Sequence, residues 1–183
     1  MTNKSIITSY IAIGTLFLGT AVFNPSYAQP SPEASVELSI EDANLTVVKQ
    51  IYADFASGNI PGFVAALSED VVWNEAENNS LAVGNPYVGP EEVMSGVMGP
   101  LMQDWSSFEV QPESFMADGN TVAMFGRYLA TSASSEKQIN PQVVHHYTLE
   151  NGKVIRFQQY VDTLALDQAM TIDPDMEKAD LPQ

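Results

Sequence analysis

The segment 143-VVHHYTLENGKVIRFQQYVD-162 decides the fold class, because it reads as two β-strands joined by a tight turn. Residues 143–150 and 154–162 are rich in β-branched and aromatic side chains, which fit the pleated surface of a sheet. Between them lies Asn151-Gly152, a dipeptide typical of two-residue hairpin turns. The segment therefore predicts an antiparallel pair of strands.

More strands are predicted upstream of this hairpin. Residues 108–115 and 121–131 have the same composition, and Asp118-Gly119-Asn120 supplies a turn between them. Residues 71–73, Val-Val-Trp, begin an earlier strand. We expect the four later strands to follow one another as an antiparallel meander.

The chain between the N-terminal region and these strands reads as helix. Ser39 precedes two acidic residues, which is typical of a helix N-terminus, and Ser57-Gly58-Asn59 is a stop signal. Between them apolar side chains recur at helical spacing, at Leu45, Val48, Ile51, Tyr52 and Phe55. We expect a short second helix over 60–67 and a third that begins at Pro90. Helices followed by a run of strands predict an α+β fold.

Residues 1–28 have the pattern of a signal peptide. Lys4 supplies the positive charge, residues 6–23 are mainly apolar, and Ser26-Tyr27-Ala28 offers small residues before a cleavage site. We expect export to the periplasm or the extracellular space after cleavage near Ala28. The alternative is an uncleaved N-terminal membrane anchor, which the polar residues within the apolar stretch disfavour.

The remaining chain divides into three parts by composition. Residues 29–38 contain prolines and small polar residues and read as a linker. Residues 39–170 carry all the predicted helices and strands, so we expect one domain there. Residues 171–183 are acidic and contain two prolines, which is typical of a disordered tail.

The charge balance and the missing cysteines exclude several classes of function. Seven Lys and Arg against 23 Asp and Glu give a net charge of −16, which repels nucleic acid and anionic membrane surfaces. Without cysteine the chain has no disulfide, thiolate metal site or cysteine nucleophile. No metal or cofactor is expected, because the two histidines and the acids do not sit at a recognised ligand spacing.

Several short motifs in this order resemble the SnoaL-like, ketosteroid-isomerase-like branch of the nuclear transport factor 2-like superfamily. The resemblance covers roughly residues 40–169. The motifs are Ile51-Tyr52-Ala53-Asp54-Phe55, Trp73-Asn74-Glu75-Ala76-Glu77-Asn78, Gly84-Asn85-Pro86-Tyr87-Val88-Gly89, Gly126-Arg127-Tyr128 and the run from Gly152 to Thr163.

The resemblance implies a cone-shaped, strongly curved antiparallel sheet wrapped by three N-terminal helices, the cystatin-like roll. It also implies a deep cavity for a small apolar or carbonyl-containing molecule, and a homodimer formed through the outer sheet face. The superfamily hosts isomerases, cyclases, hydrolases and binders without catalytic activity, so the fold does not fix the reaction.

Four residues are candidates for acid–base chemistry: Asp162, His145, Tyr160 and Glu75. Asp162 and Tyr160 are two residues apart on the last strand and so share a face. SnoaL-like cyclases use a late-strand carboxylate near a histidine as general acid or base, so the resemblance implies this role for Asp162 with His145. The alternative for Asp162 is the N-cap of a helix over 163–170.

The choice of histidine and the choice of proton-carrying acid each depend on a further feature of the sequence. His145 and His146 point to opposite faces of a strand, so only one can face the cavity, and the resemblance favours His145. Steroid isomerases carry the proton on an early-strand Asp, but here Trp73 is followed by Asn74 and Glu75. Glu75 is the nearest acid, and no Tyr and Asp pair can be assigned as oxyanion hole, which argues against steroid isomerisation.

Trp73, Tyr87, Arg127 and Met98 are the candidates for ligand binding. Trp73 and Tyr87 would supply large apolar walls with one polar atom each, and Met98 belongs to a run of methionines at every fourth position. Arg127 would need a carboxylate partner if its strand face is interior. The alternative for each is ordinary core packing or a structural ion pair.

Two functions fit these residues. The first is an enzyme that performs acid–base chemistry on a small apolar carbonyl or epoxide compound. The second is a ligand-binding or carrier module without catalytic activity, which the apolar wall and the missing nucleophile motif favour.

Overall fold

The computed structural model describes residues 38–171. The expected signal peptide at 1–28, the linker up to residue 37 and the acidic tail from residue 172 lie outside the described residues. Helices and helical turns are α1 (Ile40–Ser57), α2 (Ile60–Ala65), η1 (Ser80–Gly84), α3 (Gly89–Val93), η2 (Met94–Met98), α4 (Gly99–Asp104) and α5 (Thr163–Met170). Strands are β1 (Leu67–Asn74), β2 (Tyr87–Val88), β3 (Trp105–Asp118), β4 (Thr121–Ser132), β5 (Gln138–Ile139), β6 (Gln142–Glu150) and β7 (Lys153–Val161).

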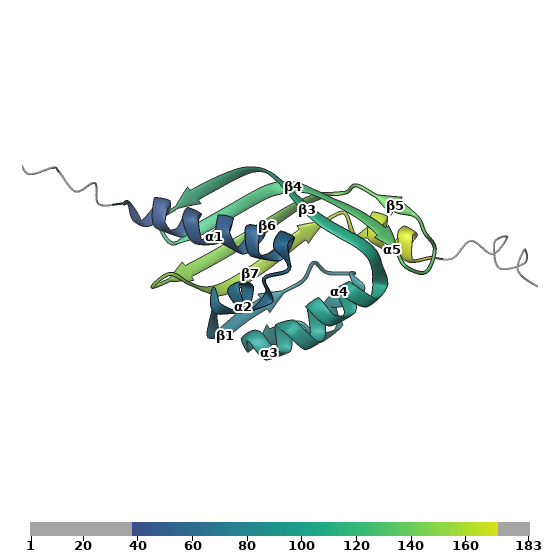
Figure 1. Ribbon diagram of the computed structural model, residues 1–183, viewed down its shortest axis with the longest axis horizontal. Helices are drawn as coiled ribbons and strands as arrows, with labels where there is room; N and C mark the ends of the chain where they lie inside the picture. The colour runs from purple at the N-terminus through teal and green to yellow at the C-terminus, as the bar shows by residue number, and fades with distance from the viewer. Residues whose placement is uncertain (1–37, 172–183) are drawn as a thin grey trace, which may run out of the picture. The chain divides into compact units, whose positions relative to one another are not determined.

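The seven strands form one curved, mixed sheet with the order β2-β1-β7-β6-β4-β3, and β5 pairs with β4 (Figure 1). The expected antiparallel meander is confirmed for β3, β4, β6 and β7. The sheet is not, as was expected, antiparallel throughout, because β1 pairs with β7 in parallel and places Trp73 opposite Phe157. The long connection between these two strands, which contains α3, α4 and the meander, makes the parallel arrangement possible.

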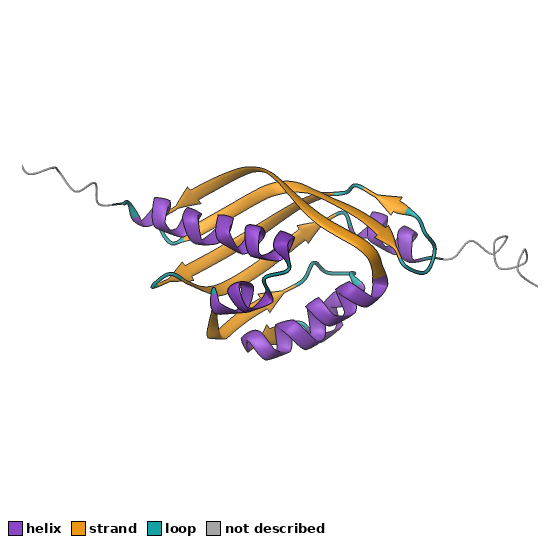
Figure 2. Cartoon of the chain, viewed as in Figure 1, coloured by secondary structure: helices purple, strands orange, loops and turns teal. Residues whose placement is uncertain are grey.

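Helix α1 has the ends that its sequence predicts. The Ser39 side chain accepts a hydrogen bond from the Asp42 backbone N–H at 3.1 Å, and Gly58 ends the helix in the left-handed conformation at φ 69°. Figure 2 shows α1 lying across one face of the sheet, with α2 and the α3–α4 helix on the same side. Val48 and Ile51 of α1 are buried in the core beneath it.

The third predicted helix is continuous from α3 through the π-helical segment η2 to α4, and Pro90 lies in its first turn. Val93, Val97 and Leu101 are buried as the stripe predicts. The run of methionines does not form one wall, however. Met98 is buried, whereas Met102 points outward and is 76% exposed.

Alternation along the strands separates an inner from an outer face of the sheet. On β6 the side chains of Val143, His145, Tyr147 and Leu149 are buried, and His146 is exposed. The inner face packs against the helices and forms the core. Among the described residues no helix is long and apolar enough to cross a membrane.

Candidate active site

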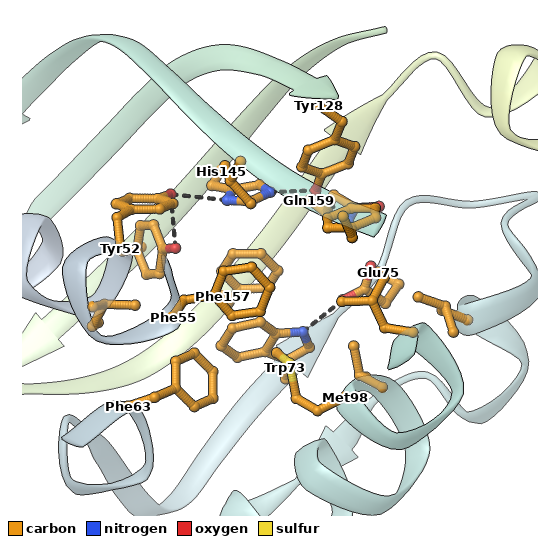
Figure 3. Close-up of a pocket in the computed structure, with 17 residues that line it drawn as sticks. Tyr52, Phe55, Phe63, Trp73, Glu75, Met98, Tyr128, His145, Phe157 and Gln159 are labelled. Carbon is orange, nitrogen blue, oxygen red and sulfur yellow. Dashed lines mark hydrogen bonds between the residues drawn. The ribbon is translucent and has the colours of Figure 1, made fainter. Parts of the chain in front are cut away.

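A cavity of about 60 Å³ lies between the helices and the inner face of the sheet (Figure 3). Most of its lining is aliphatic or aromatic, including Phe55 and Phe63 from the helices and Phe157 from β7. Hydroxyl, carboxyl, imidazole and amide groups interrupt this apolar surface. They belong to Tyr52, Glu75, Tyr128, His145, Tyr147 and Gln159.

Glu75 directly follows β1 and is held through both its side chain and its main chain. The indole N–H of Trp73 donates to Glu75 Oε1 at 2.7 Å. The Asn85 side chain accepts from the Glu75 backbone N–H at 3.0 Å and donates to the Glu75 carbonyl at 2.8 Å. The other carboxyl oxygen, Oε2, is buried and has no hydrogen-bond partner among residues 38–171. Such an atom is costly to bury, so it marks a place where a further group can bind.

Burial also changes the acidity of Glu75. The residue is only 2% exposed, and desolvation raises its pKa from 4.5 to about 7. The hydrogen bond from the Trp73 indole and the nearby Gln159 amide act in the opposite direction, but their effect on the pKa is weaker. Protonated and ionised forms of this carboxyl group are therefore both populated at neutral pH, which is the condition for a general acid or base.

The position of Glu75 depends on the parallel pairing of β1 with β7. This pairing stacks the Trp73 ring on Phe157, with 3.7 Å between ring centroids and 18° between ring planes. The stack fixes the indole, whose N–H in turn fixes one oxygen of the carboxyl group. The parallel pairing of β1 with β7 thus builds the acidic part of the site.

A chain of four hydrogen-bonded side chains forms the other polar part. The hydroxyl groups of Tyr147 and Tyr52 are 2.9 Å apart, and the Tyr52 hydroxyl is 2.8 Å from His145 Nδ1. On the far side of the imidazole, the Tyr128 hydroxyl is 2.6 Å from His145 Nε2. Helix α1 supplies Tyr52, β4 supplies Tyr128, and the inner face of β6 supplies the other two.

All four members of this chain are neutral at physiological pH. Desolvation lowers the pKa of His145 to about 3, so the imidazole carries no charge. Desolvation raises the pKa of the three phenols above its usual value, so each keeps its proton.

The four hydrogen-bonded side chains hold one proton more than the bonds between them need. Three hydroxyl groups and one imidazole N–H provide four donors, but the three links of the chain use only three of them. If His145 carries its proton on Nε2, the unused hydroxyl proton is on Tyr128. If the proton is on Nδ1, the unused proton is on Tyr147. These four side chains therefore offer the cavity one hydrogen-bond donor, which is the hydroxyl group of either Tyr128 or Tyr147.

Gln159 joins this chain to the region around Glu75. Its Oε1 accepts from the Ala76 backbone N–H and from the Asn79 side chain, each at 3.3 Å. The amide nitrogen must therefore be the group that donates to the Tyr128 hydroxyl, at 2.9 Å. This bond holds the Tyr128 oxygen in place in both proton arrangements.

Four of the eight residues proposed from the sequence line the cavity. They are Glu75, His145, Trp73 and Met98. Their roles stay predictions, because geometry alone does not test them. No cluster of three or more His, Asp and Glu side chains that could hold a metal occurs within residues 38–171.

The expectation that Tyr160 and Asp162 face the cavity is wrong. Alternation on β7 turns Phe157 and Gln159 inward, so Tyr160 lies on the outer face and is 58% exposed. Asp162 is the N-cap of α5 and accepts from the Ala165 backbone N–H at 3.2 Å. The helix-cap alternative therefore describes Asp162.

Arg127 and Tyr87 also lie outside the cavity lining. Arg127 is on the outer face of β4, and its guanidinium donates to the side chain and, at 2.7 Å, to the carbonyl of Asn140 rather than to a carboxylate. Tyr87 instead closes the η1 turn, because its hydroxyl donates to the Leu81 carbonyl at 2.6 Å and accepts from the Gly84 N–H at 3.3 Å.

Four residues of the site were not among the sequence candidates: Tyr52, Tyr128, Tyr147 and Gln159. Signals for two of them were present. Tyr147 shares a strand face with His145, and Gln159 shares one with Phe157. Tyr52 and Tyr128 come from other elements and meet His145 only in the folded chain, so no local pattern could join them.

Comparisons with known proteins agree with this fold. A sequence model of the SnoaL-like domain matches residues 48–157. A crystal structure of an NTF2-like protein from Burkholderia thailandensis is 25% identical, with a TM-score of 0.67 over 70% of this chain and 97% of that one. No curated protein sequence matches the chain significantly.

Two other solved structures share the fold. A protein from Jannaschia sp. CCS1 assigned to the SnoaL-like polyketide cyclases is 18% identical, with a TM-score of 0.65 over 75% of this chain and 98% of that one. TerC, co-crystallised with polyporic acid, is 21% identical, with a TM-score of 0.64 over 70% of this chain and 98% of that one. Because the domain match spans more than half of the sequence, the chain belongs to the family of SnoaL-like domains.

Proposed function

We propose that this protein binds a small, apolar, carbonyl-containing molecule in its cavity and moves a proton on that molecule, with Glu75 as the proton carrier. The observation that supports this most is the buried Oε2 atom of Glu75, which has no partner among the described residues and borders an apolar cavity. A structural carboxyl group would be expected to have both oxygens bonded. The complex of TerC with polyporic acid adds support, since a protein with this fold holds a small organic molecule.

The chemistry follows from the two polar parts of the site. Ionised Glu75 removes a proton from the carbon next to the ligand carbonyl. The carbonyl oxygen gains the negative charge and accepts a hydrogen bond from the unused hydroxyl proton of Tyr128 or Tyr147. Glu75 then returns the proton to carbon, so that the carboxylate is regenerated and no atom is lost.

Hydrogen–deuterium exchange tests this proposal without knowledge of the natural ligand. The uncharged ketone 4-phenyl-2-butanone is incubated with the protein in heavy water, and loss of its α-proton signals is followed by NMR. We expect the wild-type chain to accelerate the exchange and Glu75→Gln to abolish the acceleration. Glu77→Gln is the matched control, because Glu77 is two residues away and exposed. Equal acceleration by Glu75→Gln and the wild type would exclude Glu75 as the carrier.

The same experiment separates catalysis from simple binding. The small cavity and its neutral hydrogen-bond donors also suit a carrier that holds a carbonyl compound without changing it. Binding of the ketone by wild-type protein with no gain in exchange would favour this second function.

We also propose that the chain is exported and forms a homodimer through the outer face of the sheet. Phe125, Val144 and Tyr160 are aligned across β4, β6 and β7 on that face, and Phe125 and Tyr160 are exposed. Such an apolar stripe is typical of a protein–protein contact. Sedimentation of the wild type and of Phe125→Lys should show a dimer and a monomer, and N-terminal sequencing of native protein should begin after Ala28. A wild-type monomer at all concentrations would exclude the dimer.

A further inference from the structure

A second cavity, of about 110 Å³, adjoins the one that contains Glu75. It lies between the segment 78–81, the start of β3 and helix α5, and Trp105, Leu166 and Met170 supply its apolar walls. Five residues line both cavities: Leu81, Leu101, Phe108, Tyr128 and Gln159. These five side chains lie between the two cavities, and we call this region the neck. We call the cavity with Glu75 the inner chamber and the cavity with Trp105 the outer chamber.

The volume of the inner chamber limits what it can hold. An apolar cavity of about 150 Å³ accommodates benzene, and the inner chamber is less than half that size. A ring therefore does not fit inside it, but the two or three carbons around a carbonyl group do. The outer chamber, at about 110 Å³, is also below this size, but the two chambers together come to about 170 Å³. A ring in the outer chamber therefore has to extend into the neck.

The outer chamber also differs in polarity. Asn78, Asn79, Ser80 and Thr163 supply neutral hydrogen-bonding groups, and Asp167 is an acid. Neither chamber is lined by a lysine or an arginine within the described residues. With a net charge of −16 on the whole chain, a carboxylate or phosphate on the ligand would be repelled, whereas hydroxyl and amide groups would find partners.

Helix α5 is fixed well enough to serve as the outer wall. Its end is tied to the β4–β5 connection, because Ser135 donates to the Ala169 carbonyl and Lys137 Nζ donates to the Thr171 carbonyl at 2.9 Å. The Asp162 side chain caps its beginning. The wall is thus anchored at both ends.

We propose that the two chambers form one binding site for an elongated, uncharged ligand, with a narrow carbonyl-bearing head in the inner chamber and a ring that carries hydroxyl or amide groups in the outer chamber. The position of the head rests on the proposed function, whereas the two-chamber site does not.

The two tryptophans of the chain test this directly, because each lines one chamber. In Trp105→Phe the remaining reporter is Trp73 of the inner chamber, and in Trp73→Phe it is Trp105 of the outer chamber. We expect 2-butanone to change the fluorescence of Trp73 alone and 4-(4-hydroxyphenyl)-2-butanone to change both. A ring-bearing ketone that binds but leaves Trp105 unchanged would overturn the proposal.

Filling the outer chamber provides a second measurement on otherwise intact protein. Ser80→Phe adds a ring to the exposed part of the lining of this chamber, and Ser95→Phe, on an exposed part of the third helix, is the matched control. We expect Ser80→Phe to weaken 4-(4-hydroxyphenyl)-2-butanone by at least about tenfold and to leave 2-butanone unchanged. Equal affinities of the two variants for the aromatic ketone would contradict the two-chamber site.

Charge selection is tested with the carboxylate analogue 4-(3-oxobutyl)benzoate. We expect it to bind at least about tenfold more weakly than the hydroxyphenyl ketone, and Asp167→Asn to reduce this difference. Equal binding of both ketones would overturn the assignment of an uncharged ligand.

Failure of proton exchange alongside the expected fluorescence changes would exclude the proposed catalysis and leave the two-chamber site standing. Proton exchange without any change in Trp105 fluorescence would exclude the two-chamber site and leave the proposed catalysis standing.

Discussion

Replacing Glu75 by Gln should change how the stability of the fold depends on pH. The pKa of Glu75 is raised from 4.5 to about 7 on folding, so between these values the folded chain holds a proton that the unfolded chain has lost. The free energy of unfolding therefore falls as pH rises through this window, by about 1.4 kcal/mol per pH unit and about 3 kcal/mol in all.

His145 acts in the opposite direction and hides this effect in the wild type. Its pKa is lowered from 6.5 to about 3 on folding, so in that window the unfolded chain holds the extra proton and stability rises with pH. From pH 4.5 to 6.5 the two slopes have similar size and opposite sign. We therefore expect these residues together to leave wild-type stability nearly flat there, and Glu75→Gln to show a clear rise.

The unfolding free energy can be measured by urea denaturation at several values between about pH 4 and pH 8, with tryptophan fluorescence as the signal. The informative quantity is the difference in unfolding free energy between the variant and the wild type at each pH, because contributions from all other groups cancel. The difference should move in favour of Glu75→Gln by about 3 kcal/mol from pH 4.5 to 7. Glu77→Gln, at an exposed position, should run parallel to the wild type. Parallel curves for Glu75→Gln and the wild type would refute the raised pKa and with it the proton-carrier role.

Two structural substitutions are also informative. Asp162→Ala removes the cap that accepts the Ala165 N–H and should cost about 1 kcal/mol of unfolding free energy in urea, with ketone proton exchange retained; loss of exchange would return Asp162 to the reaction. Gly96→Ala places a Cβ 2.2 Å from the Tyr87 ring and should cost about 1–3 kcal/mol, whereas Gly99→Ala meets nothing closer than 3.4 Å and should cost less. Equal thermal midpoints for the two alanine variants would show that Tyr87 moves aside freely.

Most of the fold could be predicted from the sequence, because its signals are local. The cap at Ser39, the stop at Gly58 and the Asn151-Gly152 turn each act within a few residues and fix the ends of elements. The parallel pairing of β1 with β7 could not be predicted this way. It joins Trp73 to Phe157 across the sequence, and no pattern within either strand specifies its partner.

The site was harder to predict because strand alternation gives two faces without saying which one is buried. Tyr160 and Gln159 are neighbours on β7, and a choice of face decides which of them meets the ligand. Which face of β7 is buried depends on what packs against it, namely Trp73 and the helices. Glu75 was identifiable as the acid nearest Trp73, but its unpartnered oxygen is a property of the folded chain alone.

The surplus proton of the Tyr147–Tyr52–His145–Tyr128 chain has a consequence for which ligands the protein can tolerate. The unused proton is on Tyr128 in one arrangement of these hydrogen bonds and on Tyr147 in the other. If both arrangements are equally populated, a ligand that selects one of them loses only about 0.4 kcal/mol of binding free energy. A ligand whose carbonyl lies near Tyr128 and one whose carbonyl lies near Tyr147 would then be accommodated almost equally well, without movement of any heavy atom. Broad acceptance of regioisomers thus does not require the side chains around the cavity to move.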